Sequence, residues 1–262
     1  MIPAFELFGK TFAIYPLMAL LGIFGAGLYI CRNTRRRGLD VNDMLIFLLI
    51  SGVGVLFGMH LLYGLTNIPL LLDLARTPGS IQSFSDFWNA VLAIFGGSVF
   101  YGGLLGGIAV GFWYGRKKRL DLSLWSDLIT PGIPLFHAFG RVGCFLGGCC
   151  YGVACQIGFQ YRYSPLLEAN GPTRFPIQLA EAGCNLILFF VLDRLLKKGR
   201  CKGRLLCAYL LCYAPVRFIL EFWRGDALRG IWWGLSTSQW ISLLVIVCVS
   251  IFLIKDCRRR AV

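Results

Sequence analysis

The chain has 262 residues, of which 57% are hydrophobic and 15% are charged, and its mean hydropathy is +0.68. Soluble domains are nearer half apolar and a quarter charged, so this composition excludes a sizeable soluble domain. The net charge of +13 does not indicate nucleic-acid binding, because the basic residues stand in short clusters between apolar runs and form no long basic arm.

Seven apolar runs are long enough to cross a bilayer, which takes about 20 residues per helix. They cover residues 12–30, 44–65, 91–114, 128–146, 177–196, 205–222 and 240–254. The fourth run contains Pro131 and Pro134, and such breaks are tolerated in a membrane where protein or water satisfies the freed backbone groups. We therefore predict an all-α polytopic membrane protein of seven transmembrane helices, organised as a single domain over residues 1–262.

The basic residues predict how these helices are oriented. Clusters at residues 32–37, 116–119, 197–204 and 255–260 belong to one set of loops, whereas the opposite set carries only scattered single residues. Loops rich in Lys and Arg face the cytoplasm. We therefore expect the N-terminus outside and the C-terminus in the cytoplasm, which fits an odd number of spans.

Glycines recur at a spacing of four residues in the second and third runs. They are Gly54 and Gly58, and then Gly103, Gly107 and Gly111. Small residues at this spacing let helices approach closely in lipid. We predict that these glycines are helix-packing positions.

Charged and phenolic side chains stand inside the apolar runs, mostly toward the ends that the orientation places outside. A charge at bilayer depth costs about 2.5–3.5 kcal/mol on insertion scales, so such residues are functional candidates. They are Tyr15, Tyr101, Arg141, Glu181, Tyr213, Arg217 and Glu221, with Arg224 just beyond the sixth run. Tyr101 stands about ten residues into its run, which predicts a position near the midplane of the bilayer.

Tyr213, Arg217 and Glu221 are spaced four residues apart, so they share one face of a helix. Placing these polar side chains against lipid would cost free energy, so we expect this helix face to line an interior cavity that opens toward the outer leaflet. Two interpretations stay open for Arg217 and Glu221: an internal ion pair, or a site for an anion. A pair of arginines suits a phosphate, such as a phospholipid headgroup, because guanidinium donors match its oxygens in a bidentate way.

Residues 136–152 read FHAFGRVGCFLGGCCYG and contain both His137 and Arg141. The glycines and cysteines after Arg141 predict backbone packed closely around a ligand rather than an ordinary helix. His137 is a candidate general base, although a lone histidine in an apolar segment is more often a hydrogen-bonded core residue.

The chain has 11 cysteines, and a group of four follows Arg141 near the expected outer surface: Cys144, Cys149, Cys150 and Cys155. Disulfides form in such a compartment, and free cysteines also pack as small apolar residues. The spacing C-x4-C-C-x4-C does not match the paired ligand spacings of zinc sites. Packing or a disulfide is therefore favoured, and we expect no metal ion and no organic cofactor.

The chain resembles the prolipoprotein diacylglyceryl transferases, which are bacterial membrane enzymes. The matching segments follow one another in the family's order: IYPLMALLG, GGSVFYGGLLGG, HAFGRVGCFLGGCCYG, RFPIQLAEA, YAPVRFILEFWRGD and LSTSQWISL. The resemblance implies a multi-pass enzyme of the bacterial inner (plasma) membrane whose partners are phosphatidylglycerol and prolipoproteins. Such an enzyme transfers a diacylglyceryl group to the lipobox cysteine thiol, forming a thioether and releasing glycerol phosphate.

The resemblance also implies roles for individual residues. Arg141 would bind the phosphate headgroup, and Arg217 would stabilise the negative charge of the leaving phosphate. The catalytic candidates are Arg141, Arg217, Tyr101 and Tyr15. The substrate-binding candidates are Arg141, Gly143, Gly152, Tyr213, Glu221, Arg224, Gln178 and Glu181.

Four positions depart from the family's pattern. Tyr101 stands where well-known members carry a histidine proposed to activate the thiol, and Phe175 also replaces a histidine. Cys144 and Cys149 replace an asparagine and a glutamate of the signature. Two other functions therefore stay open, namely a homologous transferase with a different acceptor and an anion or lipid transporter. The absence of evident internal repeats disfavours transport, and adjacent cysteines match redox motifs poorly.

Overall fold

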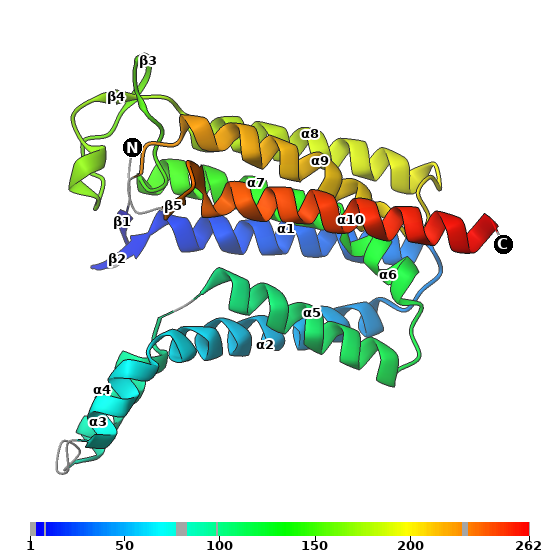
Figure 1. Cartoon of the computed structure of the whole chain (residues 1–262), viewed down its shortest axis with the longest axis horizontal. Helices are drawn as coiled ribbons and strands as arrows, with labels where there is room; N and C mark the ends of the chain where they lie inside the picture. The colour runs from blue at the N-terminus through cyan, green and yellow to red at the C-terminus, as the bar shows by residue number, and fades with distance from the viewer. Residues whose placement is uncertain (1–3, 8, 77–82, 98, 227–229, 262) are drawn as a thin grey trace. The chain divides into compact units, whose positions relative to one another are not determined.

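The computed structural model describes residues 4–7, 9–76, 83–97, 99–226 and 230–261 (Figure 1). Most of these residues are helical. They form two compact units, one made of Met1–Asn33 with Ser123–Val262 and the other of Thr34–Leu122, and each unit is described by itself.

The first unit is a bundle of long helices that contains most of the predicted site. These helices are α1 (Ile14–Arg36), α7 (Gly132–Gly147), α8 (Ile177–Lys197), α9 (Leu205–Leu220) and α10 (Thr237–Ala261). Helix α8 packs on α7 and α9, and α9 packs on α10. The Tyr29 hydroxyl donates to Asp193 Oδ1 at 2.9 Å, which joins α1 to α8. The carboxylate of Asp127, on the short helix α6 (Leu122–Ile129), accepts from the backbone N–H of Leu205 at 3.0 Å and so satisfies a donor where α9 begins.

The second unit pairs two long helices with two short ones. They are α2 (Val41–Thr66), α3 (Ile68–Arg76), α4 (Phe84–Phe95) and α5 (Phe100–Lys117). Helix α2 packs along α5, while α3 and α4 contact α2 and each other. A capping box starts α4: the Ser83 hydroxyl accepts from the backbone N–H of Asp86, and the Asp86 carboxylate accepts from that of Ser83.

Glycines bring the backbones of α2 and α5 into contact, as their spacing predicts. A Cβ atom added at Gly58 would lie 2.2 Å from the carbonyl oxygen of Gly102, and one at Gly54 would lie 2.6 Å from that of Gly106. A Cβ at Gly103 would lie 3.2 Å from Val55 Cγ1, so this glycine also faces α2. The helix-packing prediction is confirmed, and the closest approach in α5 lies one residue before the predicted series.

Among the described residues, three short antiparallel hairpins, which the sequence did not predict, lie before α1, before α8 and before α10. They are β1 (Ala4–Leu7) with β2 (Lys10–Ala13), β3 (Ala154–Gln160) with β4 (Thr173–Arg174), and β5 (Ile231–Trp232) with β6 (Leu235–Ser236). The segment around β3 and β4 has a small core of Tyr151, Tyr161 and Ala169. The Arg174 guanidinium lies 4.2 Å from the centre of the Tyr151 ring and donates to the Ala169 carbonyl, so this arginine holds the segment together.

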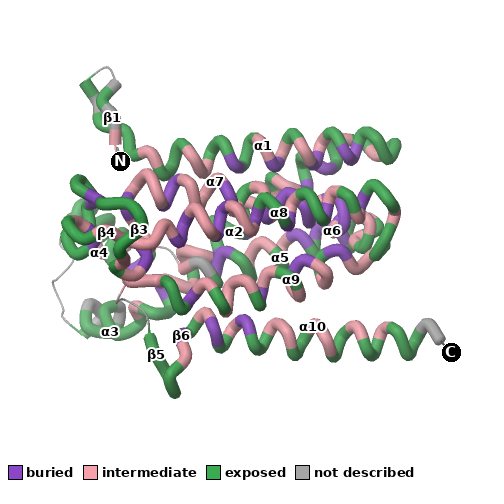
Figure 2. Tube along the Cα trace, turned by 90° about the horizontal axis from the view of Figure 1, so that it is seen from above, coloured by how far each residue is buried: buried purple, intermediate pink, exposed green. Residues whose placement is uncertain are grey.

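The surface of the helices is apolar. Helices over Ile14–Arg36, Val41–Thr66, Leu205–Trp223 and Thr237–Arg259 are long and apolar enough to cross a membrane, and they match four of the predicted spans. Exposed positions run along the length of α10, where Leu244 is 62% and Ile254 is 55% exposed (Figure 2). Soluble proteins rarely expose such contiguous apolar surface. The chain is therefore a helical membrane protein, which confirms the predicted class.

Two of the predicted spans are not continuous helices; the break in the fourth was expected from its prolines, whereas the break in the third was not. The span over residues 91–114 is interrupted between the end of α4 at Phe95 and the start of α5 at Phe100. The span over residues 128–146 is interrupted at Pro131, which lies between α6 and α7 and has no amide hydrogen to continue a helix. Apolar composition alone did not reveal the break in the third span.

Helix packing through Gly58 generates a test of the second unit. Replacing Gly58 by Ala places a methyl group against the Gly102 carbonyl, so we expect α2 and α5 to be forced apart at a cost of about 1–3 kcal/mol. The measurement is the thermal unfolding midpoint of the purified protein in detergent. Gly52→Ala on the same helix is the matched control, because nothing lies within 4 Å of its added Cβ. Equal midpoints for the two variants would contradict this packing.

Candidate active site

Three helices of the first unit meet at one buried carboxylate. Glu181 of α8 is 1% exposed, and its Oε2 lies 3.0 Å from Nε of Arg141 on α7. The Tyr213 hydroxyl of α9 donates to Glu181 Oε1 at 2.9 Å. His137, one turn before Arg141, accepts from the arginine Nε through its own Nε2 at 3.2 Å. The carboxylate thus compensates the charge of Arg141 where water is scarce.

The contacts of Arg141 leave the far end of its guanidinium available. Among the described residues, its hydrogen bond and its ion pair are both made by Nε. The side chain keeps 15% of its surface exposed. The terminal nitrogens Nη1 and Nη2 can therefore donate to a further partner, and their spacing suits two oxygens of one phosphate.

A second arginine lies between α9 and the start of α10. Arg217 Nη2 is 2.7 Å from Glu221 Oε2 and donates to Ser238 Oγ at 3.0 Å. Arg217 and Glu221 therefore form an ion pair, while the anion-site interpretation of Arg217 stays a prediction. The pair does not use the whole guanidinium, because Nη1 of Arg217 is buried and has no hydrogen-bond partner in the described part of the chain. A buried donor without a partner costs free energy, so an anion that reaches Nη1 gains affinity there.

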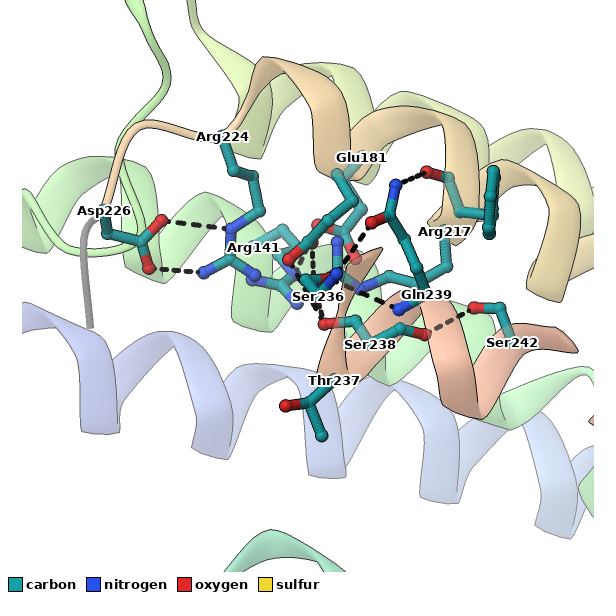
Figure 3. Close-up of polar contacts among 12 residues, drawn as sticks. Arg141, Glu181, Arg217, Arg224, Asp226, Ser236, Thr237, Ser238, Gln239 and Ser242 are labelled. Atoms are coloured by element: carbon teal, nitrogen blue, oxygen red, sulfur yellow. Dashed lines mark hydrogen bonds and ion pairs between the residues drawn. The ribbon is translucent and has the colours of Figure 1, made fainter. Parts of the chain in front are cut away.

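Both arginines act on the same neighbouring side chains. His137 and Tyr213 each interact electrostatically with Arg141 and with Arg217. The Tyr213 ring stacks on Tyr209, with centroids 5.5 Å apart, and lies 5.4 Å from the His137 ring. Figure 3 shows the arginines with Glu181 and with the polar residues at the start of α10. We therefore treat the two arginines as parts of one site.

Arg224 has an acidic partner of its own. Its Nη2 lies 2.8 Å from Asp226 Oδ2 and its Nε lies 3.3 Å from Oδ1, a two-point pair drawn in Figure 3. The backbone at Arg224 bridges to that at Gly152. A Cβ at Gly152 would lie 2.2 Å from the Phe175 carbonyl oxygen, so the close backbone approach already explains this glycine. The predicted binding roles of Arg224 and Gly152 stay predictions.

Gln178 holds the segment that follows α7. Its side-chain amide donates to the Cys149 carbonyl and to the Tyr161 hydroxyl, both at 2.8 Å. Burial raises the pKa of the Tyr161 phenol above its ordinary value, so this hydroxyl stays neutral. Gln178 therefore holds the backbone of Cys149, just after α7, in place.

Gly143 allows α7 to approach α1. A Cβ added there would lie 3.0 Å from Met18 Cβ and 3.3 Å from Tyr15 Cδ2, so Tyr15 lies against this part of α7. Tyr15 is 47% exposed and interacts electrostatically with Arg141. Two of the predicted site residues, Tyr15 and Arg141, are therefore brought together.

Two expectations about local structure are wrong. The residues after Arg141 remain in α7 as far as Gly147, because Gly143 serves helix packing rather than an irregular loop. Tyr101 lies in the first turn of α5 rather than deep within a continuous helix, so its expected depth near the midplane has no support. Tyr101 belongs to the second unit, and its catalytic role stays a prediction.

Ser238 was not predicted as a site residue. Its hydroxyl accepts from Arg217 and contacts Glu221 Oε1 at 3.4 Å, so it connects both members of the ion pair. The residue stands in the quoted segment LSTSQWISL, but a serine in an apolar run carries no charge and no strong signal.

The fold and this site define a helical membrane protein in which two arginine side chains, each paired with a buried carboxylate, keep nitrogen donors available. Comparison with known sequences agrees with this class. The model of the family described as prolipoprotein diacylglyceryl transferase matches residues 3–255. The chain belongs to the prolipoprotein diacylglyceryl transferase family.

Individual relatives support the same assignment. A phosphatidylglycerol–prolipoprotein diacylglyceryl transferase of Clostridium tetani is 33% identical over 258 residues, which cover 98% of this chain and 97% of the relative. A second protein of this name, from Clostridium perfringens, is 30% identical over 92% of this chain and 90% of its own length. One from Helicobacter hepaticus is 29% identical over 95% of this chain and 87% of its own length.

The pair of Arg141 and Glu181 generates a test of the site's electrostatics. Glu181→Leu leaves the Arg141 charge buried without its partner, so we expect a loss of about 3–5 kcal/mol of stability. Arg141→Leu in the same chain removes that charge and should restore most of the loss. Thermal unfolding of both single variants and the double variant measures the coupling.

Lys197→Ala is the control for this cycle, because Lys197 forms an exposed pair with Asp193 that contributes less than about 1 kcal/mol. Additive effects of the Arg141 and Glu181 substitutions would show that the two side chains do not stabilise each other.

Proposed function

We propose that this chain transfers the diacylglyceryl group of phosphatidylglycerol to the lipobox cysteine thiol of prolipoproteins. The names of its relatives describe such a reaction for those proteins. The observation that carries the proposal is the availability of guanidinium donors: Nη1 and Nη2 of Arg141, and the buried Nη1 of Arg217. A phosphodiester headgroup supplies the oxygens that these donors lack.

The proposed reaction breaks the carbon–oxygen bond between the diacylglyceryl carbon and the phosphate and forms a carbon–sulfur bond. The electron pair of the broken bond stays on the oxygen of the leaving glycerol phosphate, and the thiol loses its proton. Negative charge therefore grows on the phosphate in the transition state. Arg141 holds the headgroup and Arg217 stabilises this charge, which is the kind of fixed electrostatic stabilisation from which enzymes gain most.

The other residues act around this centre. Glu181, which accepts from the Tyr213 hydroxyl, holds Arg141 at Nε, and Glu221 holds Arg217 at Nη2. The remaining donors of both arginines therefore keep a fixed direction. In this proposal the phenolate form of Tyr101 receives the thiol proton and becomes a neutral phenol; the role rests on its position where the family carries a histidine. Gly143, Gly152, Gln178, Arg224 and Tyr15 complete the proposed set around the bound lipid.

For the whole chain, the proposal is a multi-pass protein of the bacterial inner (plasma) membrane. Seven spans, an N-terminus outside and a cytoplasmic C-terminus agree with the distribution of basic residues. Residues 1–262 act as a single transferase domain, and the partners are phosphatidylglycerol and prolipoproteins. The four helices with span-like length and hydropathy support the membrane location.

A reconstituted assay tests the reaction. Purified protein is mixed with phosphatidylglycerol and a lipobox peptide, and the release of glycerol phosphate is followed. Arg141→Ala and Arg217→Ala should each lower the rate by about 10²- to 10³-fold, because each removes a donor to the developing charge. Arg141→Lys should recover little, since an ammonium group lacks the planar fork. Arg162→Ala, at an exposed arginine, is the matched control and should keep the rate.

The same assay separates the alternatives. A peptide with Ser in place of the lipobox Cys should give no release, and release that ignores this change would point to a different acceptor. Lipid binding without any release under these conditions would reject the transferase and favour transport. A Tyr101→Phe variant that keeps the full rate would remove Tyr101 from the proposed mechanism.

Cysteine labelling tests the orientation. Single-cysteine variants that retain either Cys201 or Cys257, both exposed and both beside cytoplasmic basic clusters, are treated with a membrane-impermeant maleimide. We expect no labelling in intact spheroplasts and full labelling in inverted vesicles. The variant that retains Cys155 should show the opposite pattern. Labelling of Cys257 in intact spheroplasts would refute a cytoplasmic C-terminus.

A further inference from the structure

Three sulfur atoms gather at the end of α7, outside the reaction proposed above. The Sγ atoms of Cys144, Cys149 and Cys150 all lie within 4.8 Å of one another. Cys144 is buried in the last turn of the helix, and the other two are partly buried just beyond it. All 11 cysteines of the chain lie in its described part, and each is free. The cluster is therefore a group of three thiols with no assigned function.

The helix end creates this cluster. Gly148 adopts a left-handed conformation with φ of 75°, and the N–H of Cys149 donates to the Cys144 carbonyl at 3.1 Å. This reversal at a helix C-terminus turns the chain back over its last turn. Cys149 and Cys150 thus return to Cys144, so the linear spacing that argued against a metal site does not describe their arrangement in space.

The turn is held from outside by other elements. The Ser164 hydroxyl donates to the Gly148 carbonyl at 2.8 Å, and the Gln178 amide donates to the Cys149 carbonyl at 2.8 Å. Cys150 has a φ of 54°, which residues with a side chain rarely adopt. Such a conformation persists only where its surroundings fix it. The three sulfurs therefore belong to a preformed arrangement rather than to a loose loop.

The number of sulfurs favours a shared ligand over a disulfide. A disulfide would join two of the three and leave the third aside, whereas the three are mutually close. A metal–sulfur bond of about 2.3 Å places sulfurs of one trigonal or tetrahedral centre about 4 Å apart, within the observed spread. Cys155 is not among the sulfurs that lie within 4.8 Å of one another, and its Sγ donates to the Ile157 carbonyl at 2.9 Å.

The charge near the cluster suits a thiolate centre. Three thiolates with one Zn²⁺ carry one net negative charge, and with one Cu⁺ they carry two. Cys150 interacts electrostatically with both Arg224 and Arg141, so positive charge stands close to the sulfurs. Thiolates are the ligands that Zn²⁺ and Cu⁺ prefer, whereas Mg²⁺ and Ca²⁺ need oxygen.

We propose that Cys144, Cys149 and Cys150 form a three-thiolate site for one thiophilic d10 cation, Zn²⁺ or Cu⁺, at the C-terminal end of α7. Binding converts three S–H groups into three metal–sulfur bonds and releases three protons to solvent. No electron transfer is involved. A Zn²⁺ ion held in this way keeps a fourth coordination position open, whereas three thiolates complete a trigonal Cu⁺ centre.

Cadmium titration of the full-length protein tests the site. Purified protein in detergent is reduced, freed of reductant without air, and titrated with Cd²⁺ while the thiolate-to-metal charge-transfer absorption is recorded. We expect saturation at one Cd²⁺ per chain. Cys149→Ser and Cys150→Ser should each weaken binding by more than about 100-fold, beyond the effect of losing an outer partner. Cys155→Ser is the matched control and should bind normally.

A second readout uses the unaltered chain, so the test does not depend on the folding of the variants. Bound Zn²⁺ should protect Cys144, Cys149 and Cys150 from alkylation, as mapped by mass spectrometry, and leave Cys155 reactive. Competition of Zn²⁺ and of Cu⁺ against bound Cd²⁺ then identifies the preferred ion.

Three results would overturn the proposal. The first is a fully reduced protein that shows no one-to-one absorption and no protection. The second is binding that survives both Cys149→Ser and Cys150→Ser. The third is the loss of two free thiols in the protein as isolated, restored by reduction without metal uptake, which would identify a disulfide pair instead. None of these results depends on transferase activity.

Discussion

A guanidinium group surrounded by lipid-facing helices is stable only where fixed partners replace water, and the first unit is organised around this requirement. Arg141 reaches Glu181 across two helices, and Tyr213 from a third helix completes the carboxylate's contacts. Removing one partner from such a group costs several kcal/mol. The packing of α7, α8 and α9 therefore depends on where the charge of Arg141 lies.

This constraint also sets what the arginines can do. Because the contacts of Arg141 with Glu181 and His137 in the described part of the chain are made at Nε, the guanidinium is fixed in direction while its terminal nitrogens stay available. Arg217 is fixed at Nη2 in a similar way by Glu221 and Ser238. Each guanidinium is thus held at one nitrogen, while at least one other nitrogen can still donate. Such pre-orientation is what allows donors to stabilise charge without rearranging during a reaction.

Sequence reasoning recovered the features that depend on local pattern. Apolar runs identified the helices that became α1, α2, α9 and α10, since length and hydropathy suffice for a lipid-facing helix. The four-residue spacing of Arg217 and Glu221 gave their ion pair, because both side chains leave one helix on the same face.

Features that depend on contacts between distant segments were not recovered. The resemblance named both Arg141 and Glu181 as candidates, but nothing in either segment showed that they form a pair, because they lie on different helices. The break between Phe95 and Phe100 was missed, although Gly96 and Gly97 stand there, because apolar residues continue on both sides. The approach of Cys149 to Cys144 depends on the backbone angle of Gly148, which composition does not reveal.

The three free thiols beside the arginines could themselves become acceptors of the transferred lipid. A protein that delivers an alkylating lipid to a cysteine thiol must not become its own acceptor, yet Cys150 already feels the charges of Arg141 and Arg224. Cys144 is buried, and the Cys149 thiol points to the Cys144 carbonyl, so two of the three sulfurs turn toward the protein. A shared cation would withhold all three from an electrophile. With the proposed cation bound, the cluster at the end of α7 would not compete with the lipobox cysteine for the lipid.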